Sequence, residues 1–420
     1  MTELNQVFGG HWLRRVEEYS FPHNICFGVG AANKVGEIAK GIAKNKNAII
    51  VTDKILVKLG TIDGPKKSLE EAGFRVDVCD SESAEPVISE AKRIIDVVKG
   101  KNYGLVVGIG GGSAMDRSKL AAVMAVTPGD VEEYLLPSEK PLKGALPKIM
   151  IPTTSGTGSE CSNFAVVSTP HREQGSVKNF IGANEAMANV AIVDPSLVLG
   201  LPPKPTAASG MDAMAHNAEG VLSLQANPLT DGLALTAIEL VSQNLRTAVH
   251  QGSNIEARWN MSLAALIGGM IITFPGVAGP ATLGHTASES MSSRYGIPHG
   301  EACGVLLPFV YWFNLPDAYG RKKIAKIAEA MGEDITGLTT KEAAEKAITA
   351  TFDLLEDVVL PTGLKAYNIP KSDIPSISDF VLNRAENLYG MADFNPVKAN
   401  LENLTGFFEK AFEGRASIGL

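Results

Sequence analysis

The first half of the chain alternates short apolar runs with stretches of helical spacing. Runs of strand-like length and pattern occupy 47–53, 74–79, 103–107, 148–151 and 190–193. Between them, a stretch such as 87–99 places apolar side chains three and four residues apart, as on one face of a helix. Strands and helices that alternate at this pitch predict a parallel sheet with helices on both faces.

From about residue 200 the helical spacing dominates. The pattern predicts helices at about 205–224, 229–247, 255–274, 283–294, 321–331, 341–358, 373–388 and 397–413. The proline-rich segment 201–205 is interpreted as a hinge. We therefore expect a Rossmann-like α/β domain over residues 1–200 and an all-helical domain over 201–420, with a cleft between them.

Composition and charge narrow the class of protein. Of 420 residues, 45% are hydrophobic and 20% are charged, which is typical of a globular chain and excludes a disordered one. The net charge is −8 and no block of Lys and Arg is present, so we expect no nucleic-acid partner. Four widely spaced cysteines and an N-terminal segment without an apolar run favour a reducing, cytoplasmic location.

Residues 261–279 are uncharged and long enough to raise the alternative of a membrane span. Four glycines and Pro275 lie within this segment, and the chain has no second segment of this kind. A buried helix is the better interpretation, and no membrane association is expected.

A glycine-rich turn carries the first candidate chemistry. Residues 104–119, GLVVGIGGGSAMDRSK, run from an apolar strand through Gly110, Gly111 and Gly112 into a helix that we expect Ser113 to open. Glycines allow close approach of the backbone to a ligand, and the unpaired N–H groups of a helix start favour phosphate. Lys119 is two turns into the helix, where it is a candidate to reach back to a ribose or phosphate.

A second loop rich in hydroxyls follows the strand at 148–151. Its candidate ligand-binding residues include Thr153, Thr154 and Thr157, at the expected mouth of the sheet. Asp53, at the end of the run 47–53, is placed to accept a hydrogen bond from a ribose 2′-hydroxyl, which favours NAD over NADP. The alternative for Asp53 is an ordinary turn residue.

Four residues form a candidate metal site in the second half. Asp212 and His216 stand four residues apart, on one face of a predicted helix, and His285 and His299 follow in segments poor in charge. Three imidazoles and one carboxylate suit Zn²⁺ or Fe²⁺, with one side left open for a substrate oxygen. The other four histidines, His11, His23, His171 and His250, lack such neighbours and are interpreted as ordinary residues.

Taken in order, the motifs GGGSAMDRSK, PTTSGTGSE, GMDAMAH, LGH and IPHGE resemble the iron-containing (group III) alcohol dehydrogenases. The resemblance starts near Phe27 and extends at least to Asn314. It implies a two-domain fold, NAD as cofactor and one divalent metal, Fe²⁺ or Zn²⁺, held by Asp212, His216, His285 and His299. It also implies hydride transfer between NAD(H) and a small alcohol or aldehyde, in a homodimer or larger homo-oligomer.

Further residues take their roles from the resemblance alone. It implies that Gly110 to Ser113 hold the pyrophosphate, that Thr153, Thr154 and Thr157 line the cofactor cleft, and that Lys178 contacts the cofactor. Two departures occur. Glu289 replaces a histidine of the family, and Glu85-Pro86-Val87 replaces its Asn-Pro-Thr. Glu289 is then a candidate for proton transfer, for orienting His285 or for binding the metal.

Three other classes of function stay open from the sequence. One is a metal-free reductase of the maleylacetate type, which would lack the set of candidate metal ligands present in this chain. An NAD- and metal-dependent lyase of the dehydroquinate synthase type needs a cluster of basic residues for its acidic substrate, and 255–315 holds only Arg258 and Arg294. A non-catalytic nucleotide-binding protein is the third alternative, because a fold alone does not establish turnover.

Overall fold

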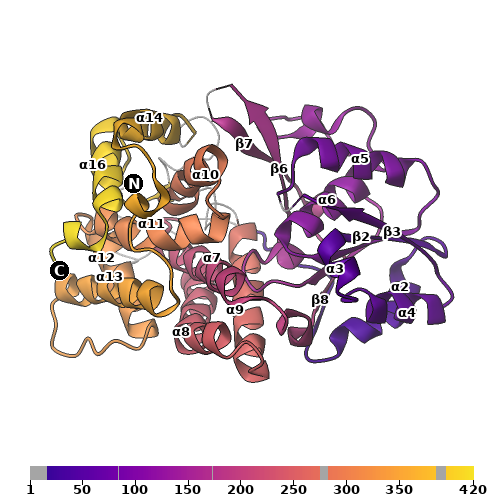
Figure 1. The fold of residues 1–420 in the computed structure, drawn as a ribbon, viewed down its shortest axis with the longest axis horizontal. Coiled ribbons are helices and arrows are strands. Elements are labelled where there is room, and N and C mark those ends of the chain that lie inside the picture. The colour runs from indigo at the N-terminus through magenta and orange to yellow at the C-terminus, as the bar shows by residue number, and fades with distance from the viewer. Residues whose placement is uncertain (1–16, 84, 173, 275–281, 385–393) are drawn as a thin grey trace.

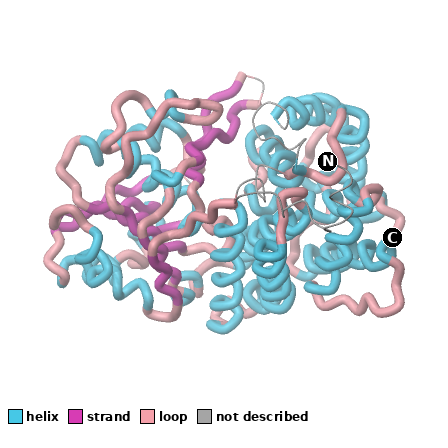
Figure 2. Tube along the Cα trace, turned by 180° about the vertical axis from the view of Figure 1, so that it is seen from behind, coloured by secondary structure: helices cyan, strands magenta, loops and turns pink. Residues whose placement is uncertain are grey.

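The chain folds into an α/β half and a helical half (Figure 1). This computed structural model describes residues 17–83, 85–172, 174–274, 282–384 and 394–420. In Figure 2, seen from behind, the strands gather in one half and the long helices in the other. The fold class predicted from the pattern, a parallel α/β half followed by a helical half, is confirmed.

Six parallel strands form the main sheet, in the order β1-β8-β5-β4-β2-β3. They are β1 (Asn24–Phe27), β2 (Asn47–Asp53), β3 (Arg75–Ser81), β4 (Leu105–Gly110), β5 (Lys148–Pro152) and β8 (Val190–Val193). All the strands predicted from apolar runs are present. The short β1 was not predicted, because two of its four residues are exposed and its pattern is weak.

Alternate side chains of the strands enter two separate cores, as the two-residue period of a strand dictates. Ile49 and Val51 face α5 (Ile88–Lys99) and α6 (Gly112–Met124). Ile50 faces the opposite layer, which includes α2 (Val35–Ile42) and α4 (Asp63–Glu71). Helices therefore cover both faces of the sheet, as expected.

The order of the strands fixes where a ligand can bind. After β2 the chain moves outward to β3, and after β4 it moves the other way, to β5. Ligands of open parallel sheets bind at such a reversal, beyond the carboxyl ends of the two strands. Here these ends are Asp53 and Gly110.

An antiparallel hairpin, β6 (Phe164–His171) and β7 (Gly175–Gly182), was missed in the sequence. It rises from the α/β half and leans toward α10 (Leu283–Tyr295) and α14 (Ile374–Arg384) of the helical half (Figure 1). Ser168 N–H donates to the Pro86 carbonyl at 2.9 Å, so the segment Glu85-Pro86-Val87 is fixed against the hairpin. Its strands mix polar and apolar positions on both faces, which hides the alternation.

The helical half contains α7 (Pro203–Leu222), α8 (Pro228–His250), α9 (Ile255–Thr273), α10 (Leu283–Tyr295), α11 (His299–Asn314), α12 (Ala318–Ala330), α13 (Thr340–Asp357), α14 (Ile374–Arg384) and α16 (Leu401–Glu413). Eight of them match predicted helices within a few residues. The last part of the predicted helix at 373–388 lies outside the described residues. The helix α11 was not predicted, although almost all of it is buried.

The uncharged stretch that raised the membrane alternative forms most of α9, which is packed in the core of the helical half. Pro275 lies outside the described residues. Among the helices that the structure describes, none is long and apolar enough to cross a membrane.

Candidate active site between the two halves

A cavity of about 220 Å³ lies between the sheet and the helical half. The α/β half contributes the start of α6, the loop after β5 and the hairpin. The helical half contributes α7, α9, α10 and α11. Its lining includes Gly112, Ser113, Thr157, Lys178, Asp212, His216, His285, Glu289 and His299. Candidate residues for a cofactor and for a metal therefore face one space.

The glycine turn forms one end of this cavity. Helix α6 begins at Gly112, one residue earlier than expected, so Ser113 is its second residue rather than its cap. A Cβ on Gly112 would stand 2.7 Å from the Thr157 methyl carbon, so no larger residue fits between α6 and the neighbouring loop. The N–H groups of the first turn thus lie at the cavity, with the geometry that favours a phosphate.

The three threonines of the loop after β5 have different surroundings. Thr157 lines the cavity, and its hydroxyl accepts from the Ser159 N–H at 3.2 Å. Thr154 lies against Gly111 at the turn, and the Thr153 N–H donates to the Gly110 carbonyl. The loop and the glycine turn are therefore packed on each other, but Thr153 and Thr154 are not part of the cavity wall.

Lys119 is not at the cavity, although the sequence suggested that it reaches a ribose or phosphate there. Its side chain is fully buried, and Nζ donates to the Ser162 and Phe164 carbonyls at 3.0 and 2.8 Å. The ammonium is therefore committed to fixing the start of the hairpin, and it does not line the cavity. The spacing of two helical turns was correct, but the helix directs this side chain inward.

Asp116, three residues earlier on α6, lines the cavity and was not singled out from the sequence. It accepts from the Ser159 hydroxyl at 2.6 Å, and Lys119 Nζ is 3.8 Å from its carboxylate. Burial raises the pKa of Asp116, while the Lys119 charge acts in the opposite direction.

Asp53 lies at the carboxyl end of β2, beside the glycine turn. One carboxylate oxygen accepts from Arg117 Nη2 at 2.5 Å. The other, Oδ2, is 3.0 Å from the position of a Cβ built on Gly110. Asp53 is thus at the predicted strand end, but it is one partner of an ion pair rather than a solitary turn residue.

Glu289 and Lys178 face each other across the cavity wall. Glu289 is 2% exposed; its carboxylate accepts from the Lys178 backbone N–H at 2.9 Å and pairs with Arg384 at 2.9 Å. Arg384 also donates to the Lys178 carbonyl at 2.6 Å. The carboxylate that replaces the family's histidine thus joins α10 and α14 to the strand β7.

Three of the four predicted metal ligands converge in the helical half. Asp212 Oδ1 is 3.8 Å from His285 Nε2 and 4.0 Å from His299 Nε2. These distances are too long for hydrogen bonds. They fit two ligands of one ion, since bonds of about 2.0–2.2 Å allow ligand atoms up to about 4.4 Å apart.

The fourth predicted ligand, His216, lies beside this group. Its ring stacks on that of His285, with centroids 4.4 Å apart and planes at 23°. In the described residues, the four groups whose ligand atoms all lie within 4.8 Å of one another are Asp212, His285, His299 and Cys303. Cys303 was not predicted, although it follows His299 by four residues on α11 and so shares its face.

Unpartnered buried atoms indicate that these residues suit a cation. Asp212 Oδ1, His216 Nδ1 and His285 Nε2 are buried and have no hydrogen-bond partner in the described part of the chain. Buried polar atoms without partners are costly, and a bound ion removes that cost. Burial lowers the pKa of His216 to about 4 and that of His299 well below its usual value. Both imidazoles are therefore neutral at pH 7, as a metal ligand must be.

Glu219 supports the cluster from behind and was also missed in the sequence. Its carboxylate accepts from His285 Nδ1 at 2.5 Å and from the His285 backbone N–H at 3.1 Å, and the Thr282 hydroxyl donates to it. Burial raises the pKa of Glu219, but the interactions with His285 outweigh it and lower the pKa. When His285 Nδ1–H donates to the Glu219 carboxylate, Nε2 carries no proton and its lone pair can bind a metal.

Apolar side chains form part of the cavity wall: Phe164, Val166 and Phe180 come from the hairpin, and Ile272 comes from α9. Phe274 packs on Tyr19 and Phe21 and is not among the lining residues.

Two family models together match most of the chain. Residues 22–195 match the model for iron-containing alcohol dehydrogenase, and residues 206–412 match the C-terminal model of the Fe-containing alcohol dehydrogenase family. The two matches follow the α/β half and the helical half described above.

Individual relatives agree with this result. The chain is 34% identical to long-chain-alcohol dehydrogenase 1 of Geobacillus thermodenitrificans (strain NG80-2), over 94% of this chain and 96% of that one. It is 36% identical to the 1,3-propanediol dehydrogenase of Klebsiella pneumoniae, over 95% and 99%. A crystal structure of a 1,3-propanediol oxidoreductase superposes with a TM-score of 0.87 at 35% identity, over 95% of this chain and 100% of that one. The chain therefore belongs to the iron-containing alcohol dehydrogenase family and is an oxidoreductase of alcohols.

Proposed function

We propose that this enzyme transfers hydride between NAD(H) and a small alcohol or aldehyde, at a divalent metal held by Asp212, His285 and His299, with His216 or Cys303 as a further ligand. The observation that carries the proposal is that this cluster and the start of α6 line one cavity. Fe²⁺ is the proposed ion, and Zn²⁺ fits the same donors.

The α/β half supplies the residues that we assign to the cofactor. The first turn of α6, with Gly110, Gly111, Gly112 and Ser113, binds the pyrophosphate through N–H groups and the helix dipole. Lys178 and Thr157 contact the nicotinamide side of the cofactor, and Asp53 accepts from the adenosine ribose. Thr153 and Thr154 support the glycine turn from the loop behind it.

When bound, the metal supplies a Lewis acid that lowers the pKa of an alcohol or polarises a carbonyl. Glu219 holds the tautomer of His285 that presents Nε2 to the ion. The apolar side chains Phe164, Phe180 and Ile272 exclude water from the cavity. Because the Glu289 carboxylate is paired with Arg384, we assign it to positioning β7 rather than to proton transfer.

Further proposals concern the setting of the enzyme. We propose a domain division at about residue 200, with domains 1–200 and 201–420. We also propose a cytoplasmic location and a homodimer or larger homo-oligomer. Gel filtration with light scattering tests the oligomer.

The experiment is a substrate screen that follows NADH absorbance on protein reconstituted separately with Fe²⁺ and Zn²⁺. The proposal expects NADH formation with one or more small alcohols, its loss on chelation and its return on adding metal. Asp212→Ala is expected to lose both bound metal and turnover, whereas Asp231→Ala, a carboxylate on α8 that pairs with Lys323, is expected to keep both.

The same screen separates the alternatives. Turnover of a phosphorylated acid without net NADH formation would support a lyase of the dehydroquinate synthase type. NAD binding with neither bound metal nor turnover would support a nucleotide-binding protein.

A further inference from the structure

A buried lysine lies at the end of the sheet opposite to the candidate active site. Lys148 is the first residue of β5, whereas the loop that carries Thr157 follows the last residue of the same strand. Lys148 is 3% exposed. Its backbone N–H donates to Asn189 Oδ1 at 2.9 Å, and its carbonyl accepts from the Asn189 N–H at 3.0 Å. The backbone from which this side chain projects is therefore fixed on both sides.

The Lys148 amine has one hydrogen-bond partner among the described residues. Its Nζ donates to the Glu185 carbonyl at 2.6 Å. An ammonium group carries a full charge and three donor hydrogens, whereas this acceptor is a single neutral oxygen. Burial with so few partners favours the uncharged form of the amine.

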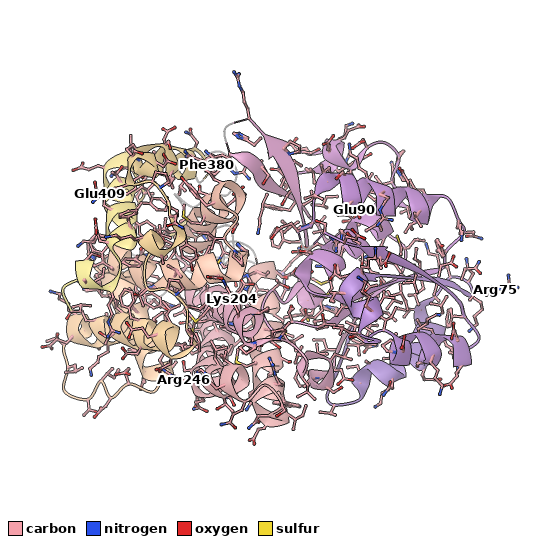
Figure 3. The ribbon with its side chains drawn as sticks, in the orientation of Figure 1. Arg75, Glu90, Lys204, Arg246, Phe380 and Glu409 are labelled. Carbon is pink, nitrogen blue, oxygen red and sulfur yellow. The ribbon has the colours of Figure 1, made fainter. Side chains whose placement is uncertain are left out.

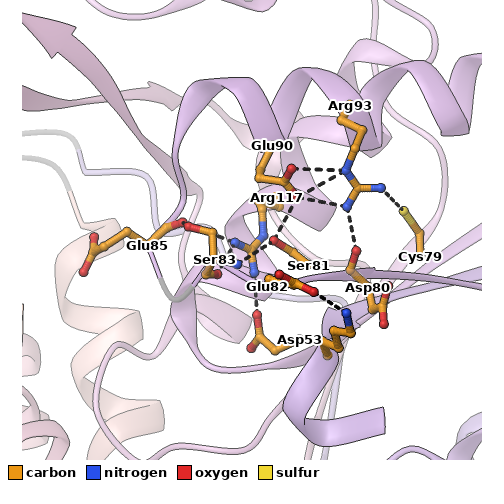
Figure 4. A network of polar contacts seen from close by, with 11 residues as sticks. Asp53, Cys79, Asp80, Ser81, Glu82, Ser83, Glu85, Glu90, Arg93 and Arg117 are labelled. Atoms are coloured by element: carbon orange, nitrogen blue, oxygen red, sulfur yellow. Dashed lines mark hydrogen bonds and ion pairs between the residues drawn. The ribbon is translucent and has the colours of Figure 1, made fainter. Parts of the chain in front are cut away.

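Other buried cations of the α/β half have a carboxylate close by. Arg117, which has no exposed surface, pairs with Asp53 at 2.5 Å, and Figure 4 shows its guanidinium beside that carboxylate. Lys119 is also fully buried, and its Nζ is 3.8 Å from the Asp116 carboxylate. In the part of the chain that the structure describes, Lys148 takes part in no ion pair of this kind. Its charge, if present, would be buried without compensation.

The charged groups around Lys148 act in opposite directions. Lys119 repels a second positive charge, and Glu185 attracts one. Lys44 and His23 lie at the adjoining cavity, where both are exposed. Burial has the largest effect and lowers the pKa of Lys148 to about 7. A lysine amine that loses its proton near neutral pH is a nucleophile.

A cavity of about 600 Å³ gives access to this amine. Lys148 is one of its lining residues, and the partly exposed Phe21 is another, so the cavity reaches the surface. The other lining residues come from segments near the amino ends of the strands, within 19–23, 44, 145–147 and 184–189. Among the described residues, none lines both this cavity and that of the candidate active site.

We propose that Lys148 is a covalent binding site for small aldehydes, which it holds as an imine. The nitrogen lone pair attacks the carbonyl carbon and a C=N bond forms, while the carbonyl oxygen leaves as water with the two hydrogens of the amine. An imine adds no charge to a buried site. A carbamate formed with carbon dioxide would instead place a negative charge near Glu185, which is unfavourable. The inference goes beyond the proposed function, because this amine is separate from the candidate metal and cofactor residues.

The test uses the folded chain without NAD(H), so that turnover of the aldehyde does not contribute. Limiting propanal is added with cyanoborohydride, which reduces each imine to a stable secondary amine, and peptide mass spectrometry gives the rate at each lysine. At pH 7 Lys148 is expected to react at least tenfold faster than Lys44, the exposed lysine of the same cavity. At pH 10, where exposed lysines generally begin to lose their protons, the ratio of the two rates is expected to fall at least tenfold.

Two matched variants identify the reacting group. Lys148→Met is expected to lose the fast reaction and to keep the rates of the other lysines, whereas Lys44→Met is expected to keep the fast reaction. Native mass spectrometry without reductant is expected to show one propanal, less one water, on the wild-type chain and on Lys44→Met but not on Lys148→Met.

Several outcomes would overturn the inference. One is a rate at Lys148 that does not exceed the rate at Lys44 at pH 7, and this comparison needs only the wild-type chain, so it does not depend on the folding of a variant. Another is a fast reaction that persists in Lys148→Met. The third is a wild-type chain that forms no propanal adduct before reduction. None of these outcomes bears on hydride transfer at the candidate active site.

Discussion

The candidate metal ligands depend on the side chains that hydrogen-bond to them. Asp212, His285 and His299 present polar atoms to one another, and Glu219 fixes the ring of His285 from the far side. The geometry of a metal site depends on such supporting contacts nearly as much as on the ligands.

Replacing Glu219 tests this dependence. Glu219→Gln is expected to lower the affinity for Zn²⁺ or Fe²⁺ by about 10–100-fold, because the amide no longer fixes the tautomer of His285. The affinity is measured by competition with a chromophoric chelator. Glu239→Gln, on the exposed face of α8, is the control and is expected to keep the wild-type affinity. Equal affinities for the two variants would show that Glu219 has no supporting role.

Glu160 provides a test based on pH. Burial raises the pKa of Glu160 to about 7, whereas the unfolded chain ionises it near its ordinary value. Above a pH of about 4.5, Glu160 ionises more readily in the unfolded chain than in the folded one, and this favours unfolding. The contribution of Glu160 to stability therefore falls as the pH rises from about 4.5 to 7. Glu160→Gln is therefore expected to stabilise the protein at pH 8 by about 1–3 kcal/mol, and not at pH 4.5.

The measurement is the midpoint of thermal unfolding at both pH values. Glu37→Gln, whose side chain is 80% exposed, is the control and is expected to change neither midpoint. A lower midpoint for Glu160→Gln at pH 8 would contradict the expected sign.

At the scale of residues, the sequence pointed to candidate ligands that the structure brings together, but not to all of their neighbours. Asp212, His285 and His299 were singled out because their residue types are scarce and chemically distinctive. Glu219 was missed because a glutamate within a helix has many other uses, and Cys303 because a lone cysteine is usually a small apolar residue in a core. The ion pair of Asp53 with Arg117 joins residues 64 positions apart, which no local pattern encodes.

At the scale of elements, the hairpin β6–β7 depends on a contact with the helical half. Glu289 on α10 and Arg384 on α14 bind the two sides of the Lys178 peptide. Since breaking a buried pair leaves one charge uncompensated, such a contact is expected to contribute strongly to the placement of β7.

Arg384→Ala is expected to destabilise the chain by about 3–5 kcal/mol and to weaken NAD binding, because Glu289 is left buried and Lys178 loses its support. Metal content is expected to stay unchanged, since the cluster does not include Glu289. Thermal unfolding and NADH titration measure the two effects. Lys371→Ala, which breaks an exposed pair with Glu413, is the control, with an expected effect below about 1 kcal/mol. A loss of metal together with unchanged NAD binding would contradict this role.

The elements missed in the sequence share a physical cause. Periodicity reveals a helix only when one face meets water, and α11 is apolar on nearly all sides and contains Pro308. The hairpin places polar residues on buried faces, where partners such as Thr169 and Asn179 bond each other. Both elements are specified by tertiary contacts, whereas the strands of the main sheet and the amphipathic helices are specified locally.

At the scale of the whole molecule, part of the contact between the two halves is made by backbone atoms. Gly158, in the loop after β5, has φ +60° and lies directly on Gly269 of α9, where a Cβ on Gly269 would stand 2.1 Å from the Gly158 carbonyl oxygen. The Ser155 and Ser262 hydroxyls add a hydrogen bond of 3.0 Å across the same contact. Figure 3 shows side chains filling the space between the halves, with Lys204 near their junction.

Gly269→Ala is expected to force the loop away from α9 and to raise the Kd for NADH at least tenfold, because the loop carries Thr157. The thermal midpoint is also expected to fall. Gly232→Ala is the matched control: a Cβ there meets nothing within 4 Å, and the better helix propensity of alanine is expected to stabilise α8 by about 0.5–1 kcal/mol. A midpoint for Gly269→Ala at or above the wild-type value would contradict this account of the contact.

His299 is the first residue of α11, and that helix runs through the middle of the helical half. The cation would consequently bridge the three helices α7, α10 and α11, so its binding energy adds to their folding energy. Iron starvation would then do more than silence the enzyme: chains without the ion would open sooner at these helices and become the preferred substrates of cellular proteases.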